Sequence, residues 1–371
     1  DGLINLDRDT KNFADYVLDF WDFDTSEYIR RRNQKAPDSI GKDYAMNMLG
    51  CFKRHAQKYL PPKLNLHEVT ASHIEKVIDS LFDEGVLSNS TVKRVVQSMS
   101  VPLKEATRKK WIAHNPMDGV ESIVNNHKER GIYSIEEIRK ILDRLYMKGT
   151  IGVTEIRKTR CKKNIWEKKP QTVKTNLKPY LAVMLAAYTG MRSGEIRALR
   201  SEQMRIVNDD FCIIKVDRAV NDYAGEKNTK GKRARSVPIP RFLYDMLIKE
   251  ASSNPHDGSS LVFWSKKSAT NPISTNFLVK QLYKAQEAIG ITEKQRLERN
   301  LDFHSLRHTF NTNLRGRISE KSLRAVVGHE SVEMSDLYTH ATEEDVIAVG
   351  VAIVDIFKSI YEGKAGDGGS T

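Results

Sequence analysis

Apolar side chains recur every three or four positions through the first 125 residues, which is the spacing of one face of an α-helix. The clearest sets are Phe13, Tyr16, Val17, Phe20 and Trp21, then Tyr44, Met48, Leu49 and Phe52, then Ile74, Val77, Ile78 and Leu81. A longer set runs from Val92 to Ala106, and Ser90 and Thr91 before it are typical of a helix N-cap. Residues 1–125 are therefore predicted to form an all-α domain.

The pattern changes after a polar stretch at residues 126–132, which is predicted to be a linker. Ser134 and Glu137 then form a capping box at the start of a helix, and a buried helix over 181–199 is interrupted at Gly190. Strands are predicted at 211–220 and 233–239, and helices near 241–252, 275–289, 304–315, 319–327 and 344–361. Residues 133–362 are thus predicted to form a mixed, mainly helical α+β domain, followed by a disordered tail at 363–371.

Basic residues outnumber acidic ones by 60 to 48, so the net charge is +12. Residues 1–130 hold 20 basic and 19 acidic side chains, whereas residues 131–371 hold 40 and 29. A basic half of this kind favours a polyanionic partner, and nucleic acid is the usual one. The longest apolar stretches, 181–188 and 346–354, fall far short of the ~20 residues that a membrane-spanning helix needs, so the sequence predicts no membrane partner.

The three cysteines, Cys51, Cys161 and Cys212, lie far apart and form no CxxC or Cys/His cluster. The sequence therefore indicates neither a disulfide framework nor a zinc site, and it fits a reducing intracellular compartment. The chain begins with Asp1, so we expect a piece of a longer protein or a processed chain. Whether a further domain precedes it stays open.

Four short segments contain the candidate catalytic residues. Residues 189–195 place Arg192 after a glycine at the start of a helix, and residues 230–239 place Lys230 in a turn before a strand. In residues 304–308, His304 and Arg307 are one helical turn apart. The last segment holds Gly328 and His329, with Tyr338 nine residues after His329.

The order of these motifs resembles the tyrosine recombinases, the phage integrase family of site-specific DNA strand-exchange enzymes. The resemblance covers residues 10–362. It implies a helical, SAM-like core-binding domain at 1–125 and a catalytic domain at 133–362, which together form a C-clamp around duplex DNA. It also implies no cofactor, no metal, and catalytic roles for Arg192, Lys230, His304, Arg307, His329 and Tyr338.

The chemistry of these side chains is compatible with that reaction. Arg192 and Arg307 supply planar, two-pronged donors to the nonbridging oxygens of a phosphodiester, where negative charge develops. The phenol of Tyr338 is a nucleophile that can form an O-(3′-phospho-DNA)-tyrosine, and Lys230 can protonate the departing 5′ oxygen. His304 and His329 can hydrogen-bond the phosphate or move a proton.

Each of these residues has a simpler interpretation. Arg192 alone would most often form a salt bridge with Glu195, which we expect to orient its own helix. Lys230 lies in a basic run with Lys227, Lys232, Arg233 and Arg235, and such a hairpin ordinarily contacts the DNA backbone; Lys227 and Lys232 stay open as alternatives. His304 and His308 have the i,i+4 spacing of zinc ligands, yet no third ligand is evident. Tyr338 alone would be a half-buried helix tyrosine.

The preferred interpretation is an integrase that inserts and excises a mobile element. Its expected partners are double-stranded recombination sites, three further copies of the chain in a homo-tetramer, and accessory directionality or DNA-bending proteins, all in the cytoplasm at the nucleoid. A Xer-type dimer resolvase is the nearest alternative, and a type IB topoisomerase or a non-catalytic DNA-binding protein are more distant ones. Residues 148–178, with ten basic and two acidic side chains, form an enlarged insertion that we expect to contact phosphates.

Overall fold

The computed structural model describes residues 11–124, 129–150, 154–160, 166–172, 176–221, 225–228, 234–327 and 342–358, with backbone only at 148–150, 154–160, 166–172 and 227–228. The chain divides into two compact units, Asp1–Lys128 and Glu129–Thr371. Each has its own apolar core. Among the described residues, no helix is both long and apolar enough to cross a membrane.

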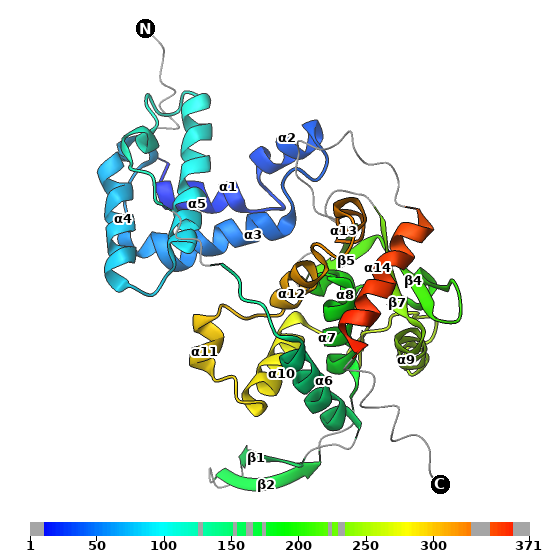
Figure 1. The fold of residues 1–371 in the computed structure, drawn as a ribbon. Coiled ribbons are helices and arrows are strands. Elements are labelled where there is room, and N and C mark those ends of the chain that lie inside the picture. Colours follow the sequence, from blue (N-terminus) through cyan, green and yellow to red (C-terminus); the bar gives the residue numbers. More distant parts are fainter. Residues whose placement is uncertain are drawn as a thin grey trace. The chain divides into compact units, whose positions relative to one another are not determined.

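The first unit is all-α, as the sequence predicts (Figure 1). Its helices are α1 (Phe13–Trp21), α2 (Glu27–Lys35), α3 (Lys42–Cys51), α4 (Ala71–Glu84) and α5 (Asn89–Arg108), with a π-turn at Phe52–Ala56 and 3₁₀ turns at Gln57–Tyr59, Leu66–Glu68 and Pro116–Gly119. Helix α4 ends at Gly85, whose φ of 63° is readily adopted only by glycine. Helix α5 begins at Asn89, two residues earlier than an N-cap at Ser90 predicts, because Ser88 occupies the N-cap.

Helix α5 contains Pro102, which cannot donate the hydrogen bond that the carbonyl of Ser98 would normally accept. The indole N–H of Trp21 on α1 donates to that carbonyl instead, at 2.8 Å. The hydroxyl of Tyr16 donates to the carbonyl of Pro102 itself, at 3.0 Å. Two buried aromatic side chains of α1 thus satisfy polar groups on α5, and this contact fixes the two helices in the core.

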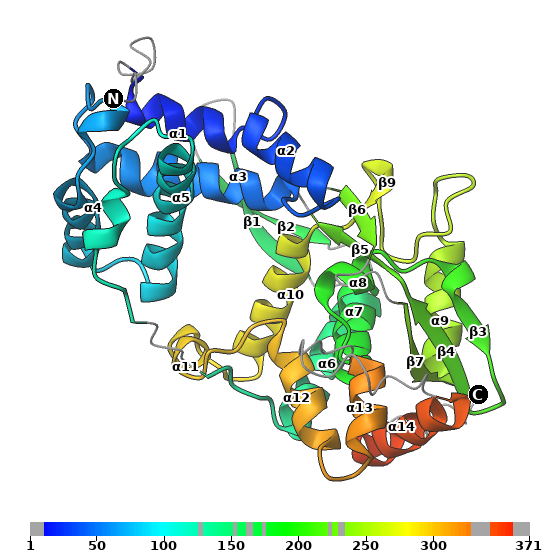
Figure 2. The same ribbon diagram turned by 90° about the horizontal axis from the view of Figure 1, so that it is seen from above.

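The second unit is built around α7 (Lys178–Thr189), in which every residue is buried. Helices α6 (Ile135–Thr150), α10 (Thr275–Ala288) and α12 (Ser305–Leu314) pack against it. The remaining helices are α8 (Ser193–Arg197), α9 (Arg241–Ser252), α11 (Glu293–Glu298), α13 (Glu320–Val327) and α14 (Glu343–Ile356), with a 3₁₀ turn at Ser201–Gln203. Figure 2 shows α7 with α6, α10 and α12 around it.

The main sheet has the order β3-β4-β7, formed by Met204–Ile206, Phe211–Val216 and Arg235–Pro240 in antiparallel pairs. The predicted strand at 211–220 is divided into β4 and β5 (Arg218–Asn221), and β5 pairs with β6 (Gly225–Asn228) in a separate hairpin. A third small sheet pairs β8 (Trp264–Ser265) with β9 (Ser268–Pro272). The sequence analysis did not predict β3, β6, β8, β9 or α11, which are all short.

The insertion at 148–178 contains an antiparallel hairpin of β1 (Thr154–Arg160) and β2 (Trp166–Thr172). Thr154 pairs with Thr172 and Arg160 with Trp166, so the register is continuous. The last described helix, α14, packs on β7 and α13 of its own unit. Its buried face contains Val346, Val349, Gly350 and Ile353.

Candidate active site

The turn between α7 and α8 presents Arg192. Helix α7 ends at Gly190, which adopts a φ of 62°, and a Cβ there would lie 2.7 Å from the ring of Phe310 on α12. A Cβ on Gly194 would lie 2.8 Å from the carbonyl oxygen of Val220. Gly190 is therefore required by its positive φ and by the ring of Phe310, and Gly194 by the close approach of the β5 backbone, so the turn folds tightly between α12 and β5.

Glu195 lies at the centre of the site, with a side chain only 2% exposed. Its carboxylate accepts from the backbone N–H of Arg192 at 2.8 Å and from Nη1 of Arg192 at 3.1 Å. It also accepts from Nη1 and Nη2 of Arg235 on β7, at 3.0 and 2.6 Å. Burial opposes ionisation, yet the hydrogen bonds and charges of Arg235 and Arg192 hold the pKa of Glu195 below its usual value.

Arg307, in the first turn of α12, is 2% exposed. Its Nη1 donates to the carbonyl of Gly190 at 2.7 Å, and its Nη2 donates to the carbonyl of Val327 at 2.8 Å. Arg307 thus connects the Arg192 turn to the last residue of α13. Burial, together with the nearby charges of Arg192 and Arg235, lowers the pKa of Arg307 to about 10, so the guanidinium is still charged at neutral pH.

His304 is the N-cap of α12 and is half-buried. Its ring meets that of His308 edge-on, with centroids 5.2 Å apart. Burial and the charge of Arg130, which forms a salt bridge with Asp302, lower the pKa of His304 to about 4. Both rings are therefore neutral at pH 7, since burial also lowers the pKa of His308.

Arg192, Arg235, Arg307 and Glu195 form one cluster. Its three guanidinium groups and one carboxylate give it a net charge of +2 among the described residues. The side chain of Arg192 is the most open of them, at 40% exposed, whereas those of Arg235 and Glu195 are buried. A buried excess of positive charge with guanidinium donors favours an anion with several oxygens, such as a phosphate group. The cluster can therefore bind a phosphodiester and stabilise charge that develops on it.

The structure describes three of the six predicted site residues, Arg192, His304 and Arg307. It brings the Arg192 turn and Arg307 together through Gly190. Lys230, His329 and Tyr338 lie outside the described residues, as does the alternative Lys232, and the other alternative, Lys227, is described only by its backbone in β6. The expected salt bridge between Arg192 and Glu195 is present at 3.1 Å, and the carboxylate of Glu195 caps its own helix, as we expected.

The sequence analysis gave Arg235 no role of its own and named it only as a member of the basic run around Lys230. In the structure its side chain is only 9% exposed and pairs with Glu195. The two residues are 40 positions apart, so no local spacing connects them. The available signal was the strand pattern: Arg235 is the first residue of β7, whereas the other members of the basic run precede the strand.

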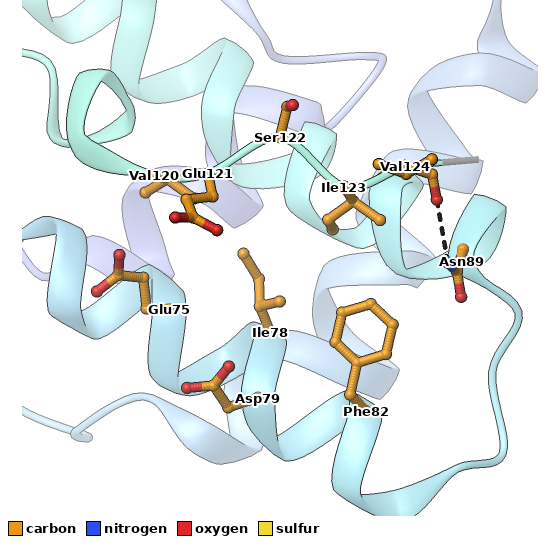
Figure 3. A pocket seen from close by; sticks show the side chains of 10 residues that line it. All are labelled: Glu75, Ile78, Asp79, Phe82, Asn89, Val120, Glu121, Ser122, Ile123 and Val124. Carbon is orange, nitrogen blue, oxygen red and sulfur yellow. Dashed lines mark hydrogen bonds between the residues drawn. The ribbon is translucent and has the colours of Figure 1, made fainter. Parts of the chain in front are cut away.

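Two further observations bear on the chemistry. Within the part of the chain that the structure describes, no group of three or more His, Cys, Asp or Glu side chains could hold a metal ion. A cavity of about 440 Å³ on α4 is lined by Glu75, Asp79 and Glu121 beside Ile78 and Phe82 (Figure 3). Its acidic side chains have the wrong charge for a DNA backbone, so this face is no candidate for the DNA interface.

The comparisons with known proteins bear on the family and the fold. Residues 164–345 match the model of the phage integrase family, and this segment contains all six predicted site residues. The integrase of Staphylococcus phage L54a is 25% identical over 306 residues, which are 78% of this chain and 81% of that protein. Residues 164–345 thus match a phage integrase domain. The comparisons support a tyrosine recombinase, and the tyrosine recombinase XerA of Thermococcus kodakarensis is 24% identical over 174 residues, 46% of the chain described here and 53% of XerA.

Solved structures establish the fold of this recombinase. The Tn1549 transposon integrase, solved with circular intermediate DNA, has a TM-score of 0.58 at 15% identity, over 91% of this recombinase and 98% of that chain. A lambda integrase tetramer bound to a Holliday junction has a TM-score of 0.55 at 18% identity, over 81% and 76% of the two chains. The predicted fold class, a helical N-terminal unit and a mixed catalytic unit of the tyrosine recombinase type, is confirmed.

Proposed function

We propose that this chain is a site-specific DNA recombinase that integrates and excises a mobile element through a 3′-phosphotyrosyl intermediate and a Holliday junction. The observation that carries the proposal is the cluster of Arg192, Arg235 and Arg307 around one buried carboxylate. Its excess of two positive charges suits the two nonbridging oxygens of a phosphodiester, in a fold that it shares with DNA integrases.

In the proposed reaction, Arg192 and Arg307 donate hydrogen bonds to the nonbridging oxygens. Arg307 has N–H donors beyond the two that contact carbonyls. The phenol of Tyr338 gives its proton to a neutral histidine, His304 or His329, as its oxygen bonds to phosphorus. The bond to the 5′ oxygen breaks, and Lys230 gives that oxygen a proton. The other histidine forms a hydrogen bond with the phosphate. A 5′ hydroxyl of the second strand reverses these steps, so no ATP is needed.

The proposed partners are duplex recombination sites and further copies of this chain. A homo-tetramer on DNA is supported by the likeness to the lambda integrase tetramer bound to a Holliday junction. The division into residues 1–125 for core-site binding and 133–362 for catalysis, enclosing the DNA as a C-clamp, belongs to the same proposal. Accessory directionality or DNA-bending proteins are further proposed partners, and the cytoplasm, at the nucleoid, is the proposed location.

A second candidate function is Xer-type resolution of chromosome or plasmid dimers, which the similarity to XerA favours. The two functions share their chemistry and differ in the sites they join. A type IB topoisomerase, in contrast, would act without a specific site.

The experiment uses nicked suicide duplexes taken from the ends of a candidate mobile element, with a dimer-resolution site and an unrelated duplex beside them. We expect covalent adducts and Holliday junctions on the element ends alone, with and without EDTA. Adducts on the dimer-resolution site alone would favour the Xer function, and relaxation of any supercoiled plasmid would favour a topoisomerase. Inhibition by EDTA would contradict the metal-free mechanism.

A further inference from the structure

Glu195 is shared by two arginines in unequal ways. Arg235 gives it two side-chain donors, at 3.0 and 2.6 Å, and is buried with it. Arg192 gives it a single side-chain donor among the described residues, at 3.1 Å, and is far more exposed. Arg235 is therefore the principal ion-pair partner, and Arg192 is the outer and weaker one.

Arg235 also reaches a third element. Its Nε donates to the carbonyl of Val326 at 2.8 Å, next to the carbonyl of Val327 that Arg307 contacts. The two arginines thus satisfy consecutive carbonyls at the end of α13, where a helix leaves such groups without intrahelical partners. The planar guanidinium of Arg235 is held by three hydrogen bonds to Glu195 and Val326, which fixes its position.

We propose that Arg235 is a positioning residue that keeps Arg192 available to the scissile phosphate, by satisfying the buried carboxylate of Glu195. A carboxylate that is 2% exposed needs a full charge-assisted partner. With Arg235 present, Glu195 needs only one donor from the side chain of Arg192. Without Arg235, the guanidinium of Arg192 turns inward and pairs with Glu195 through two parallel hydrogen bonds. The proposal rests on the proposed function, because the substrate that Arg192 contacts is the phosphodiester.

The test compares two variants, Arg235→Gln and the double variant Arg235→Gln with Glu195→Gln. Arg235→Gln leaves Glu195 charged, so Arg192 is withdrawn and single-turnover cleavage of a suicide duplex falls by about 30-fold or more at saturating DNA, approaching the ~100-fold that complete loss of one oxyanion donor costs. The double variant has no charge to withdraw Arg192, so we expect it to cleave at least about tenfold faster than Arg235→Gln. DNA affinity should change by no more than a few-fold in either variant.

The matched control is Arg241→Gln, since Arg241 directly follows β7, has a side chain 38% exposed, and contacts Asp245 at i,i+4 and the ring of Tyr244 on its own helix. It should cleave like the wild type. Arg235→Lys, which keeps one cation beside Glu195, should lose less than Arg235→Gln and gives a second measurement if the Gln variant does not fold.

Three results would overturn the proposal: wild-type cleavage by Arg235→Gln, no recovery in the double variant, or equal losses in Arg235→Lys and Arg235→Gln at temperatures where both are folded. The second result would mean that Arg235 acts only through the fold or through Val326. If the wild type and Arg241→Gln form no adduct at any site, the proposed function itself fails, which is a different outcome.

Discussion

The two described arginines of the site are held in different ways, and this gives each a different sensitivity to substitution. Arg192 is half open to solvent, whereas both terminal nitrogens of Arg307 donate to buried carbonyls. A lysine keeps the charge but cannot reproduce planar, paired donors. Arg192→Lys and Arg307→Lys are each predicted to slow single-turnover cleavage by roughly a hundredfold, comparable to losing one oxyanion donor.

Only Arg307→Lys should also lower the unfolding midpoint, because it leaves the carbonyl of Gly190 or of Val327 without its donor. Single-turnover cleavage of a suicide duplex and thermal unfolding together separate the two effects. Near-normal cleavage by both lysine variants would show that neither guanidinium contacts the phosphate.

The lowered pKa of His304 makes the stability of the fold depend on pH, and the direction of that dependence follows from the shift. Burial and the charge of Arg130 lower its pKa to about 4 in the folded chain, from 6.5 when unfolded. Between these values the unfolded chain binds more protons, so stability rises with pH from about 4 to 6.5 and is complete above that range. We predict a loss of about 1–2 kcal/mol as the pH falls from 6.5 to 4, less than the full shift gives, because solvent screens a ring that is only half-buried.

Urea unfolding of wild type and His304→Gln at several pH values checks this prediction. The Gln variant should show a flatter dependence on pH, with a part remaining because burial also lowers the pKa of His308. Identical slopes in the two proteins would mean that the pKa of His304 is not lowered.

The residues that the sequence could predict are those whose motif is local. Arg192 and Glu195 are three positions apart, and His304 and Arg307 are also three apart, so their proximity follows from a single helical turn. The partnership of Arg235 with Glu195, and of Arg307 with Gly190, joins segments 40 and 117 positions apart. Only the packing of β7, α7, α8 and α12 creates these contacts, so no spacing rule could predict them.

At the scale of elements, long periodic helices were predicted and short strands were not. Helices α9, α10, α12 and α13 lie close to the predicted ranges because each has an apolar face several turns long. Strands of two to five residues, such as β3, β6, β8 and β9, are too short to show alternation and depend on their partners for stability.

The last helix is apolar around much of its circumference, so it needs a groove on its own domain or on a neighbouring copy. In the structure α14 packs on its own unit: Phe357 after it stacks on Tyr188 at 4.5 Å, and a Cβ on Gly350 would lie 2.9 Å from the ring of Phe211. Gly350→Val is therefore predicted to lower the free energy of unfolding by about 1–3 kcal/mol through overpacking.

Val351→Ala is the matched control, because Val351 is exposed and neighbours Gly350 on the same helix. It should leave unfolding unchanged, as measured by urea denaturation of both variants. An unchanged midpoint in Gly350→Val, with loss of tetramer formation on DNA, would instead mean that this face of α14 contacts another copy.

The insertion is an element whose charge predicts its role. Its hairpin of β1 and β2 lies in a segment with a net charge of +8, from ten basic and two acidic residues at 148–178. Each neutralised phosphate contributes about −0.9 to the slope of log K against log salt. If three or four of these side chains reach phosphates, a variant with a shortened insertion should bind with a slope flatter by about three units, equally on specific and random duplexes. An unchanged slope would mean that the insertion does not contact DNA.

At the scale of the whole molecule, the two units differ in net charge and in chemistry. Residues 1–130 are nearly neutral and form a helical unit fixed by the contacts of Trp21 and Tyr16 with α5. Residues 131–371 carry a net charge of +11 and hold the cluster around Glu195. Composition could predict this asymmetry and the polyanionic partner, whereas the motif order was needed to predict the reaction.

The central claim is that Tyr338 forms a covalent bond with DNA in a site built around Arg192 and Arg307. The most direct measurement is the amount of SDS-stable protein–DNA adduct on a nicked suicide duplex, followed by mapping of the modified residue by mass spectrometry. We predict that wild type forms a 3′-phosphotyrosyl adduct on Tyr338, and that Tyr338→Phe forms none while its DNA affinity stays within a few-fold, because one hydroxyl contributes little to a charged interface. Adducts that persist in Tyr338→Phe, or that map to another tyrosine, would contradict the claim.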